Sequence, residues 1–240
     1  MKYIRLCLAL FVLVAACTAT AQTRENPLTI NGKNVFLPQW MLDGRVSRFQ
    51  TQDKENAPAK GGIVFAGSST IEKWASAQDG FLPLEILNRG IGGSTTLQWL
   101  YLCDPLILAY EPRLVVFFCG TNDLGANGTP AQADEVLANT RYILDRILGK
   151  LPDCRILYLS VTKAPSRQGS WAAMDRVNEA VKLLAEKEPR MVYYEMNRLV
   201  FTDDGQADET CYEKDRLHLN HAAYVQLTQE IKPLIESLIP

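Results

Sequence analysis

From residue 61 onward, short apolar runs alternate with longer amphipathic stretches. Apolar runs rich in β-branched and aromatic residues are typical of strands buried on both faces, and helices between them are typical of a parallel sheet. Two such runs are continuous, Gly62 to Ala66 (GIVFA) and Leu114 to Cys119 (LVVFFC). Further strands are expected at Leu84 to Asn88, Arg155 to Val161 and Met191 to Met196. The pattern predicts an α/β fold, a flavodoxin-like three-layer α/β/α sandwich with a five-stranded parallel sheet.

Helices are expected between and after these strands. They cover residues 95–109, 131–148, 171–187 and 220–238, and Asn220 is suited to cap the last one. In open parallel sheets, reactive groups gather at the carboxyl ends of the strands. Residues 50–60 are polar and contain a proline, which predicts a surface connection leading into the first strand.

The length and charge of the chain limit the number of domains and the kind of partner. A chain of 240 residues, 47% of them hydrophobic and 22% charged, suits one globular domain, which we place at residues 35–240. The net charge is -2, and because Lys2 and Arg5 near the N-terminus contribute +2, the remainder carries -4. Such a chain offers no basic stripe for phosphates, so nucleic acid is not expected as a partner.

Residues 1–16 have the features of an export signal. A short positive region with Lys2 and Arg5 is combined with an apolar run from residue 4 to residue 14, and small residues follow. The apolar run is too short to span a bilayer permanently. The sequence Val14-Ala15-Ala16-Cys17 resembles the lipobox of bacterial lipoproteins, in which cleavage precedes a cysteine that becomes lipidated.

Two cleavage sites compete in this region, and they imply different locations. Lipidation of Cys17 would attach the protein to a membrane, because each buried methylene is worth about 0.8 kcal/mol, and residues 17–34 would then form a polar tether. An ordinary signal-peptidase site at Ala19-Thr20-Ala21 would instead release a secreted protein. We expect an exported protein, either a periplasmic or cell-surface lipoprotein or a secreted one.

Four cysteines lie beyond the leader. An oxidising exterior would permit disulfides among them, although the spacing does not show which would pair. Cys119 ends an apolar run and is expected to be a small buried hydrophobe. No CxxC pair or His-rich cluster is present, so no metal is expected. The four residues are Cys103, Cys119, Cys154 and Cys211.

Two short motifs follow the first two predicted strands. Gly67-Ser68-Ser69-Thr70 places a serine at a strand-to-helix turn, where the hydroxyl is exposed and a helix N-terminus favours developing negative charge. By itself this motif also suits an ordinary turn or cap. Residues 88–95 (NRGIGGST) contain glycines that leave backbone N–H groups open to a ligand. A phosphate loop is excluded there because the full GxGxxG pattern is missing.

Two further motifs lie at the end of the third strand and before the last helix. Residues 119–123 (CGTND) contain Asn122, whose amide can donate to an oxyanion or simply stabilise a turn. Asp215 and His218 are three residues apart, which predicts that the carboxylate accepts the Nδ1 proton and orients the ring. The other histidine, His221, has no acidic residue three positions before it and is expected to be structural or exposed.

Together, in this order, the four motifs resemble the sequence blocks of the SGNH (GDSL-type) hydrolases, over residues 61–238. The resemblance implies that Ser69 is the nucleophile, with Asp215 and His218 as the orienting acid and the base. It also implies that Gly93 and Asn122 donate to an oxyanion beside the N–H of Ser69. The sequence departs from the family at Ser68, where the name-giving Asp is usual.

The resemblance implies a carboxylic ester hydrolase that works through an acyl-enzyme and needs no cofactor. His218 would take the Ser69 proton, so the rate should fall on acidification. A short acyl group, such as O-acetyl on a carbohydrate, is the expected substrate, and lysophospholipid or other lipid esters are the alternative. An inactive surface binding lipoprotein and a flavin or nucleotide binder are less favoured. Three tryptophans are expected in the core rather than at a substrate site, namely Trp74, Trp99 and Trp171.

Overall fold

The computed structural model describes residues 28–239, and its centre is a five-stranded parallel sheet. The strands lie in the order β4-β3-β5-β6-β7, so the chain starts inside the sheet and adds strands on both sides. The predicted α/β sandwich with five parallel strands is confirmed. The strands are β3 (Ile63–Gly67), β4 (Ile86–Gly90), β5 (Leu114–Phe118), β6 (Arg155–Leu159) and β7 (Met191–Tyr194).

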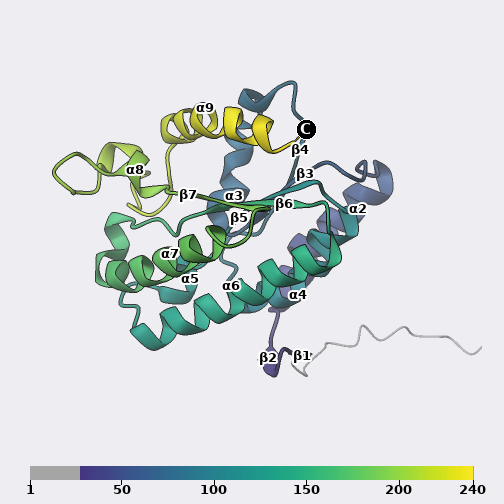
Figure 1. The fold of residues 1–240 in the computed structure, drawn as a ribbon, viewed down its shortest axis with the longest axis horizontal. Helices are drawn as coiled ribbons and strands as arrows, with labels where there is room; N and C mark the ends of the chain where they lie inside the picture. The colour runs from purple at the N-terminus through teal and green to yellow at the C-terminus, as the bar shows by residue number, and fades with distance from the viewer. Residues whose placement is uncertain (1–27, 240) are drawn as a thin grey trace, which may run out of the picture.

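Helices cover both faces of the sheet (Figure 1). One face packs against α4 (Thr96–Leu106), α6 (Pro130–Lys150) and α7 (Trp171–Ala185), and the other packs against α9 (His221–Leu238). Every residue of β3 and β5 is buried, as the continuous apolar runs require. The shorter helical elements are α3 (Ser69–Lys73), η2 (Trp74–Phe81), η3 (Leu108–Tyr110), α5 (Thr121–Leu124), η4 (Pro165–Ser170), α8 (Asn197–Val200) and η5 (Glu209–Cys211).

Polar side chains cap the helices that start next to strand ends. Thr95 and Gln98 form a reciprocal capping box at the start of α4, in which the Thr95 N–H donates to Gln98 Oε1 at 2.9 Å. Asn220 caps α9 by accepting a hydrogen bond from the Ala223 N–H at 3.0 Å, as predicted. Each cap fixes the residue at which a helix begins, and therefore the residue at which the preceding loop ends.

The segment before β3 differs from the sequence-based expectation. Residues 50–60 were predicted to be a surface connection, but the chain is helical through α1 (Gln39–Met41), η1 (Leu42–Val46) and α2 (Ser47–Glu55). That prediction is wrong for residues 50–55. The physical reason is that Met41, Val46 and Phe49 bury one face of the segment in the core, so its polar residues form the solvated face.

A short hairpin precedes this helical segment. Strands β1 (Leu28–Ile30) and β2 (Lys33–Val35) pair antiparallel, and Lys33 Nζ donates to Asn139 Oδ1 on α6 at 2.8 Å. Residues 28–34 of the predicted tether are therefore structured against the domain. The predicted signal, Cys17 and both cleavage sites lie outside the described residues. None of the helices described in residues 28–239 combines the length and apolar character that a membrane crossing requires.

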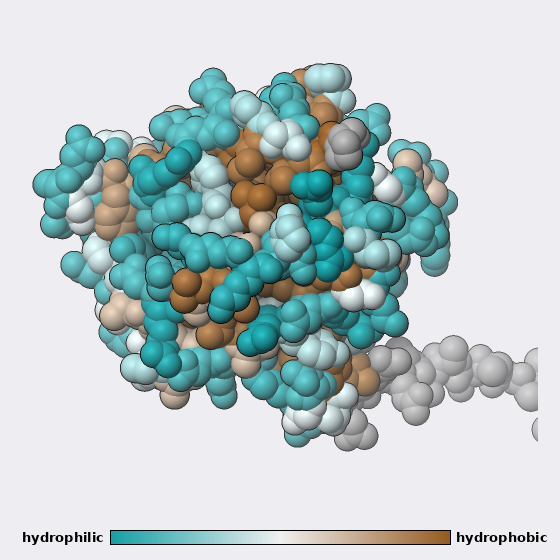
Figure 2. All heavy atoms as spheres, in the orientation of Figure 1, coloured by the Kyte–Doolittle hydropathy of each residue, from teal (hydrophilic) through white to brown (hydrophobic). Residues whose placement is uncertain are grey.

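Most cysteines and tryptophans of residues 28–239 are buried. The four cysteines in this range are free thiols, Cys119 is buried as predicted, and burial raises the pKa of Cys103 to about 12. Trp74 and Trp99 are core residues, as predicted, whereas Trp171 is half-buried. On the face that Figure 2 shows, hydrophilic residues predominate and apolar patches lie between them.

Candidate active site

The turn after β3 separates the two neighbouring serines. Ser68 is only 1% exposed, and its N–H donates to the Phe118 carbonyl at 2.9 Å, which ties this position to β5. Ser69 is half-buried and begins α3, with its Oγ 3.0 Å from His218 Nε2. Gly67 makes the sharp turn possible, because its φ is +142° and a Cβ there would collide with the Phe118 carbonyl. Only Ser69 of the pair therefore faces the histidine.

The acid and the base lie in a bend before α9 rather than in a helical turn. Asp215 Oδ2 is 2.6 Å from His218 Nδ1. Asp215 Oδ1 also accepts the N–H groups of Leu217 at 2.9 Å and His218 at 3.0 Å. Arg216, with φ of +55°, turns the chain so that one carboxylate reaches all three groups. The spacing of three residues thus brings Asp215 and His218 together in a loop, and hydrogen bonds to the Asp215 carboxylate hold that loop in shape.

These hydrogen bonds set the charge of Asp215. Desolvation of the carboxylate acts to raise its pKa, but the hydrogen bonds from the His218 N–H, the His218 ring and the Leu217 N–H outweigh it. The pKa of Asp215 is therefore well below its ordinary value. The carboxylate remains ionised at neutral pH and can hold the imidazole in the tautomer that protonates Nδ1.

Potential oxyanion donors surround Ser69 on the adjacent strand ends. Gly93, after β4, has φ of +78°, a conformation that favours glycine. Within residues 28–239, the N–H groups of Ser69 and Gly93 donate to no protein acceptor. Asn122, in α5, donates from Nδ2 to the Ser94 carbonyl at 2.9 Å and lines the same hollow as Ser69. The structure therefore brings Ser69, Asp215, His218 and Asn122 together, and Gly93 follows Gly92, where an added Cβ would lie 3.7 Å from Ser69 Cβ.

Asp123 is a site residue that sequence reasoning missed. Its Oδ1 accepts the Thr96 N–H at 2.9 Å and the Thr96 hydroxyl at 2.5 Å, at the first turn of α4. Burial raises the pKa of Asp123, and the hydrogen bonds from Thr96 oppose that effect. These bonds connect the loop that carries Asn122 to the loop that carries Gly93. In the sequence, the only indication of this role is that Asp123 directly follows Asn122.

The hollow beside Ser69 is small and is closed on the β6 side. Its volume is about 10 Å³. Thr162 and Ala164, which follow β6, are both buried and form this wall. The hollow is lined by Ser68, Ser69, Thr70, Phe118, Thr121, Asn122, Thr162, Ala164, Leu217 and His218.

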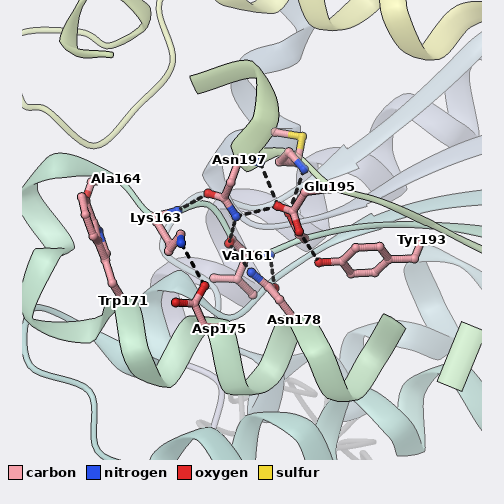
Figure 3. Close-up of polar contacts among 11 residues, drawn as sticks. Val161, Lys163, Ala164, Trp171, Asp175, Asn178, Tyr193, Glu195 and Asn197 are labelled. Carbon is pink, nitrogen blue, oxygen red and sulfur yellow. Dashed lines mark hydrogen bonds and ion pairs between the residues drawn. The ribbon is translucent and has the colours of Figure 1, made fainter. Parts of the chain in front are cut away.

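A polar cluster holds the β6 wall in place (Figure 3). Asn178 of α7 accepts the Val161 N–H at 2.7 Å and donates to the Val161 carbonyl at 2.9 Å. Asn197 of α8 accepts the Lys163 N–H at 2.8 Å and donates to Glu195 Oε1 at 2.7 Å. Because buried amides fix consecutive backbone groups, residues 161–164 form a rigid wall. No sequence motif indicated this cluster.

The remaining sequence candidates lie apart from these groups. His221 is exposed at the first residue of α9, as predicted. Within residues 28–239, no group of three His, Cys, Asp or Glu side chains is arranged to hold a metal ion. The site is therefore built from a hydroxyl, an imidazole, a carboxylate and hydrogen-bond donors.

Comparison with known proteins identifies the family. The model of the GDSL-like Lipase/Acylhydrolase family matches residues 60–225, which is more than half of the chain. The chain belongs to this family. The predicted resemblance to GDSL-type hydrolases is thereby confirmed, and membership of the GDSL-like acylhydrolases supports ester hydrolysis as the activity.

Relatives of this GDSL-like acylhydrolase include proteins with different names. The Bos taurus platelet-activating factor acetylhydrolase IB subunit alpha1 is 25% identical over 80% of this chain and 81% of its own. A GDSL-like lipase from Bacteroides thetaiotaomicron superposes with a TM-score of 0.65 at 22% identity, over 80% of this chain and 97% of its own. A carbohydrate esterase family 3 protein from Talaromyces cellulolyticus has a TM-score of 0.58 at 15% identity, over 76% and 98%. The two structures share the fold.

Proposed function

We propose that this acylhydrolase is a serine esterase that hydrolyses short-chain carboxylic esters, with O-acetyl groups on carbohydrate as its substrate class. The observation that carries the proposal is the 3.0 Å contact between Ser69 Oγ and His218 Nε2, with Asp215 2.6 Å from the other ring nitrogen. A nucleophile, a base and an orienting acid in hydrogen-bond reach are what covalent ester hydrolysis requires.

The proposed reaction proceeds in two halves. His218 Nε2 takes the proton of Ser69 as the oxygen attacks the ester carbonyl, and the resulting imidazolium is stabilised by Asp215. The tetrahedral oxyanion accepts hydrogen bonds from the N–H groups of Ser69 and Gly93 and from Asn122 Nδ2. His218 then protonates the departing alcohol. Water, deprotonated by the same imidazole, attacks the carbonyl of the acyl-enzyme. The imidazolium then protonates the Ser69 oxygen as its bond to the acyl group breaks, and the acid is released.

The size of the hollow supports a short acyl group. Its volume of about 10 Å³ is near the minimum that holds one water molecule. The buried Thr162 and Ala164 close it, and the polar cluster behind them resists widening. An acetyl methyl suits such a space, whereas a long acyl chain needs an apolar channel. This favours acetyl esters over the alternative of a lysophospholipase or other lipid acylhydrolase.

The names of the relatives point to two classes of ester. One group is named as platelet-activating factor acetylhydrolase subunits and one structure as a carbohydrate esterase. For this chain we propose the carbohydrate class. If Cys17 is lipidated, as the sequence predicts, the enzyme would act on glycans at the periplasmic or cell-surface side of a membrane.

The test is hydrolysis of p-nitrophenyl esters from acetate to decanoate by the purified protein and two neighbouring variants. Ser69→Ala is expected to lower kcat/KM by at least about 10³-fold, because the nucleophile is lost. Ser68→Ala is the matched control and should retain activity, since that residue does not face His218. The acetate ester should be the best substrate.

Three outcomes would contradict parts of the proposal. A Ser69→Ala variant as active as the parent would show that the nucleophile is misassigned. Decanoate cleaved faster than acetate would favour a lipid acylhydrolase. A well-folded protein that cleaves no ester would favour a binding lipoprotein without catalysis.

A further inference from the structure

Trp40 lies beside the candidate oxyanion site with its ring largely exposed. The side chain is 52% exposed, and its Cη2 atom is 3.9 Å from the position that a Cβ on Gly93 would occupy. The sequence analysis weighed three other tryptophans and did not consider this one. Exposed large hydrophobic residues within the described range are Phe36, Trp40, Leu82, Leu183 and Val225.

The segment that carries Trp40 is fixed to the domain. The next residue, Met41, is fully buried, and Val46 is buried five residues later. Arg45 Nη1 forms an ion pair at 2.6 Å with Glu72 Oε1, on the helix that begins at Ser69. Leu37, three residues before Trp40, is buried as well, so the segment is anchored on both sides of the ring and holds Trp40 beside Gly93.

Trp40 and the small hollow lie on opposite sides of Ser69. In the sheet order β4-β3-β5-β6-β7, Gly93 follows β4, Ser69 follows β3, and the wall of the hollow follows β6. When the methyl of an acetyl group fills the hollow and the ester oxygen faces His218, the rest of the alcohol portion can extend toward the exposed Gly93. The Gly93 side is the one on which Trp40 is exposed.

We infer that Trp40 is the platform on which a sugar ring of the alcohol portion stacks. The inference rests on the proposed function and adds the residue that selects the alcohol. An indole offers a flat apolar face and a polar N–H edge, which suits the apolar face and the hydroxyl edge of a pyranose. Specificity sites commonly combine such aromatic faces with a few polar groups.

The surroundings of Trp40 favour a sugar over a lipid. Gln39 and Asp43 are exposed on the same short helical segment and hydrogen-bond to each other at 2.7 Å. Arg45 and Glu72 add a partly exposed ion pair. Charged and amide groups on the segment that carries Trp40 can hydrogen-bond to hydroxyls, whereas a lipid chain would require a continuous apolar surface.

The experiment keeps the acetyl group constant and changes the alcohol. Acetate release from acetylated xylo-oligosaccharides and from ethyl acetate is measured by titration for the parent, Trp40→Ala and Trp40→Phe. Trp40→Ala is expected to lower the ratio of kcat/KM for the sugar ester to that for ethyl acetate by about tenfold, through KM. Trp40→Phe should restore part of the ratio. Leu82→Ala removes an exposed apolar side chain elsewhere and should leave the ratio unchanged.

A binding measurement separates this inference from the proposed chemistry. Ser69→Ala protein is titrated with the same acetylated oligosaccharide while tryptophan fluorescence is recorded. A saturable change that disappears in Ser69→Ala/Trp40→Phe supports stacking on Trp40, whether or not the esterase assignment holds.

Other outcomes would overturn the inference. Equal losses on both esters would show that Trp40 only supports the Gly93 loop. A loss confined to an acetylated lysophospholipid would assign Trp40 to lipid. If the parent cleaves ethyl acetate but no sugar ester, the esterase stands and the sugar platform is wrong.

Discussion

The two sides of Ser69 are built differently. On the β6 side, Thr162 and Ala164 are buried and buried amides hold the backbone behind them. On the β4 side, Gly93 is exposed and the nearest large side chain, Trp40, is open to solvent. A rigid closed wall limits what fits, whereas an open aromatic face accepts varied groups. In the proposals above, the closed side limits the acyl group and the open side carries the ring that contacts the alcohol.

Among the groups that flank Ser69, Asn122 is the proposed oxyanion donor that is a side chain, and its removal should have the largest effect. Asn122→Ala is expected to lower kcat for all esters by about 10²–10³-fold, because a preorganised donor is lost. The measurement is kcat for p-nitrophenyl acetate and butyrate. Asn127→Ala, an exposed asparagine five residues on, is the control. A loss for one acyl length only would mean that Asn122 shapes the hollow instead.

The pH dependence of kcat/KM tests the role of His218, which contacts Ser69 between the two sides. A protonated imidazole cannot accept the Ser69 proton, so kcat/KM should fall from about pH 8 to pH 5, approaching tenfold for each pH unit at the acid end. Asp215 stays ionised over this range because its folded-state pKa is lowered, and it would be protonated only at still lower pH. We therefore expect the acid side of the kcat/KM profile to fit the titration of a single group.

Two results would change that interpretation. A flat profile would remove His218 from the role of base. A limb steeper than one proton would indicate that Asp123, whose pKa is raised by burial, also titrates in this range and disturbs the Asn122 loop.

Widening the closed side should have a smaller effect that appears in selectivity. Ala164→Gly removes a methyl group from the wall of the hollow. The ratio of kcat/KM for propionate to that for acetate should rise by about tenfold, near the lower end of the roughly 1–3 kcal/mol that one methylene in a pocket is worth. Ala172→Gly, at an exposed position of α7, is the control. An unchanged ratio would place the acyl group outside the hollow.

The strands and the motifs at their ends were predictable because their signals are local. The runs at residues 62–66 and 114–119 are short, continuously apolar and rich in β-branched and aromatic residues, as in strands buried on both faces, and parallel strands bring their carboxyl ends to one edge. Ser69, Gly93 and Asn122 follow three adjacent strands, so the topology alone brings them near one another. Asp215 and His218 are close because they are three residues apart.

The sequence by itself determined the fold class and the family, and it predicted a nucleophile, a base and their partners. Only the tertiary structure decided that Trp40 lies against Gly93, that Asp123 connects two loops through Thr96, and that Asn178 holds Val161. Each of these contacts joins segments that are far apart in the chain, and each forms only when helices pack on the sheet. Local sequence patterns do not predict such pairs, because the hydrogen bonds and the buried surfaces that join them form only in the folded chain.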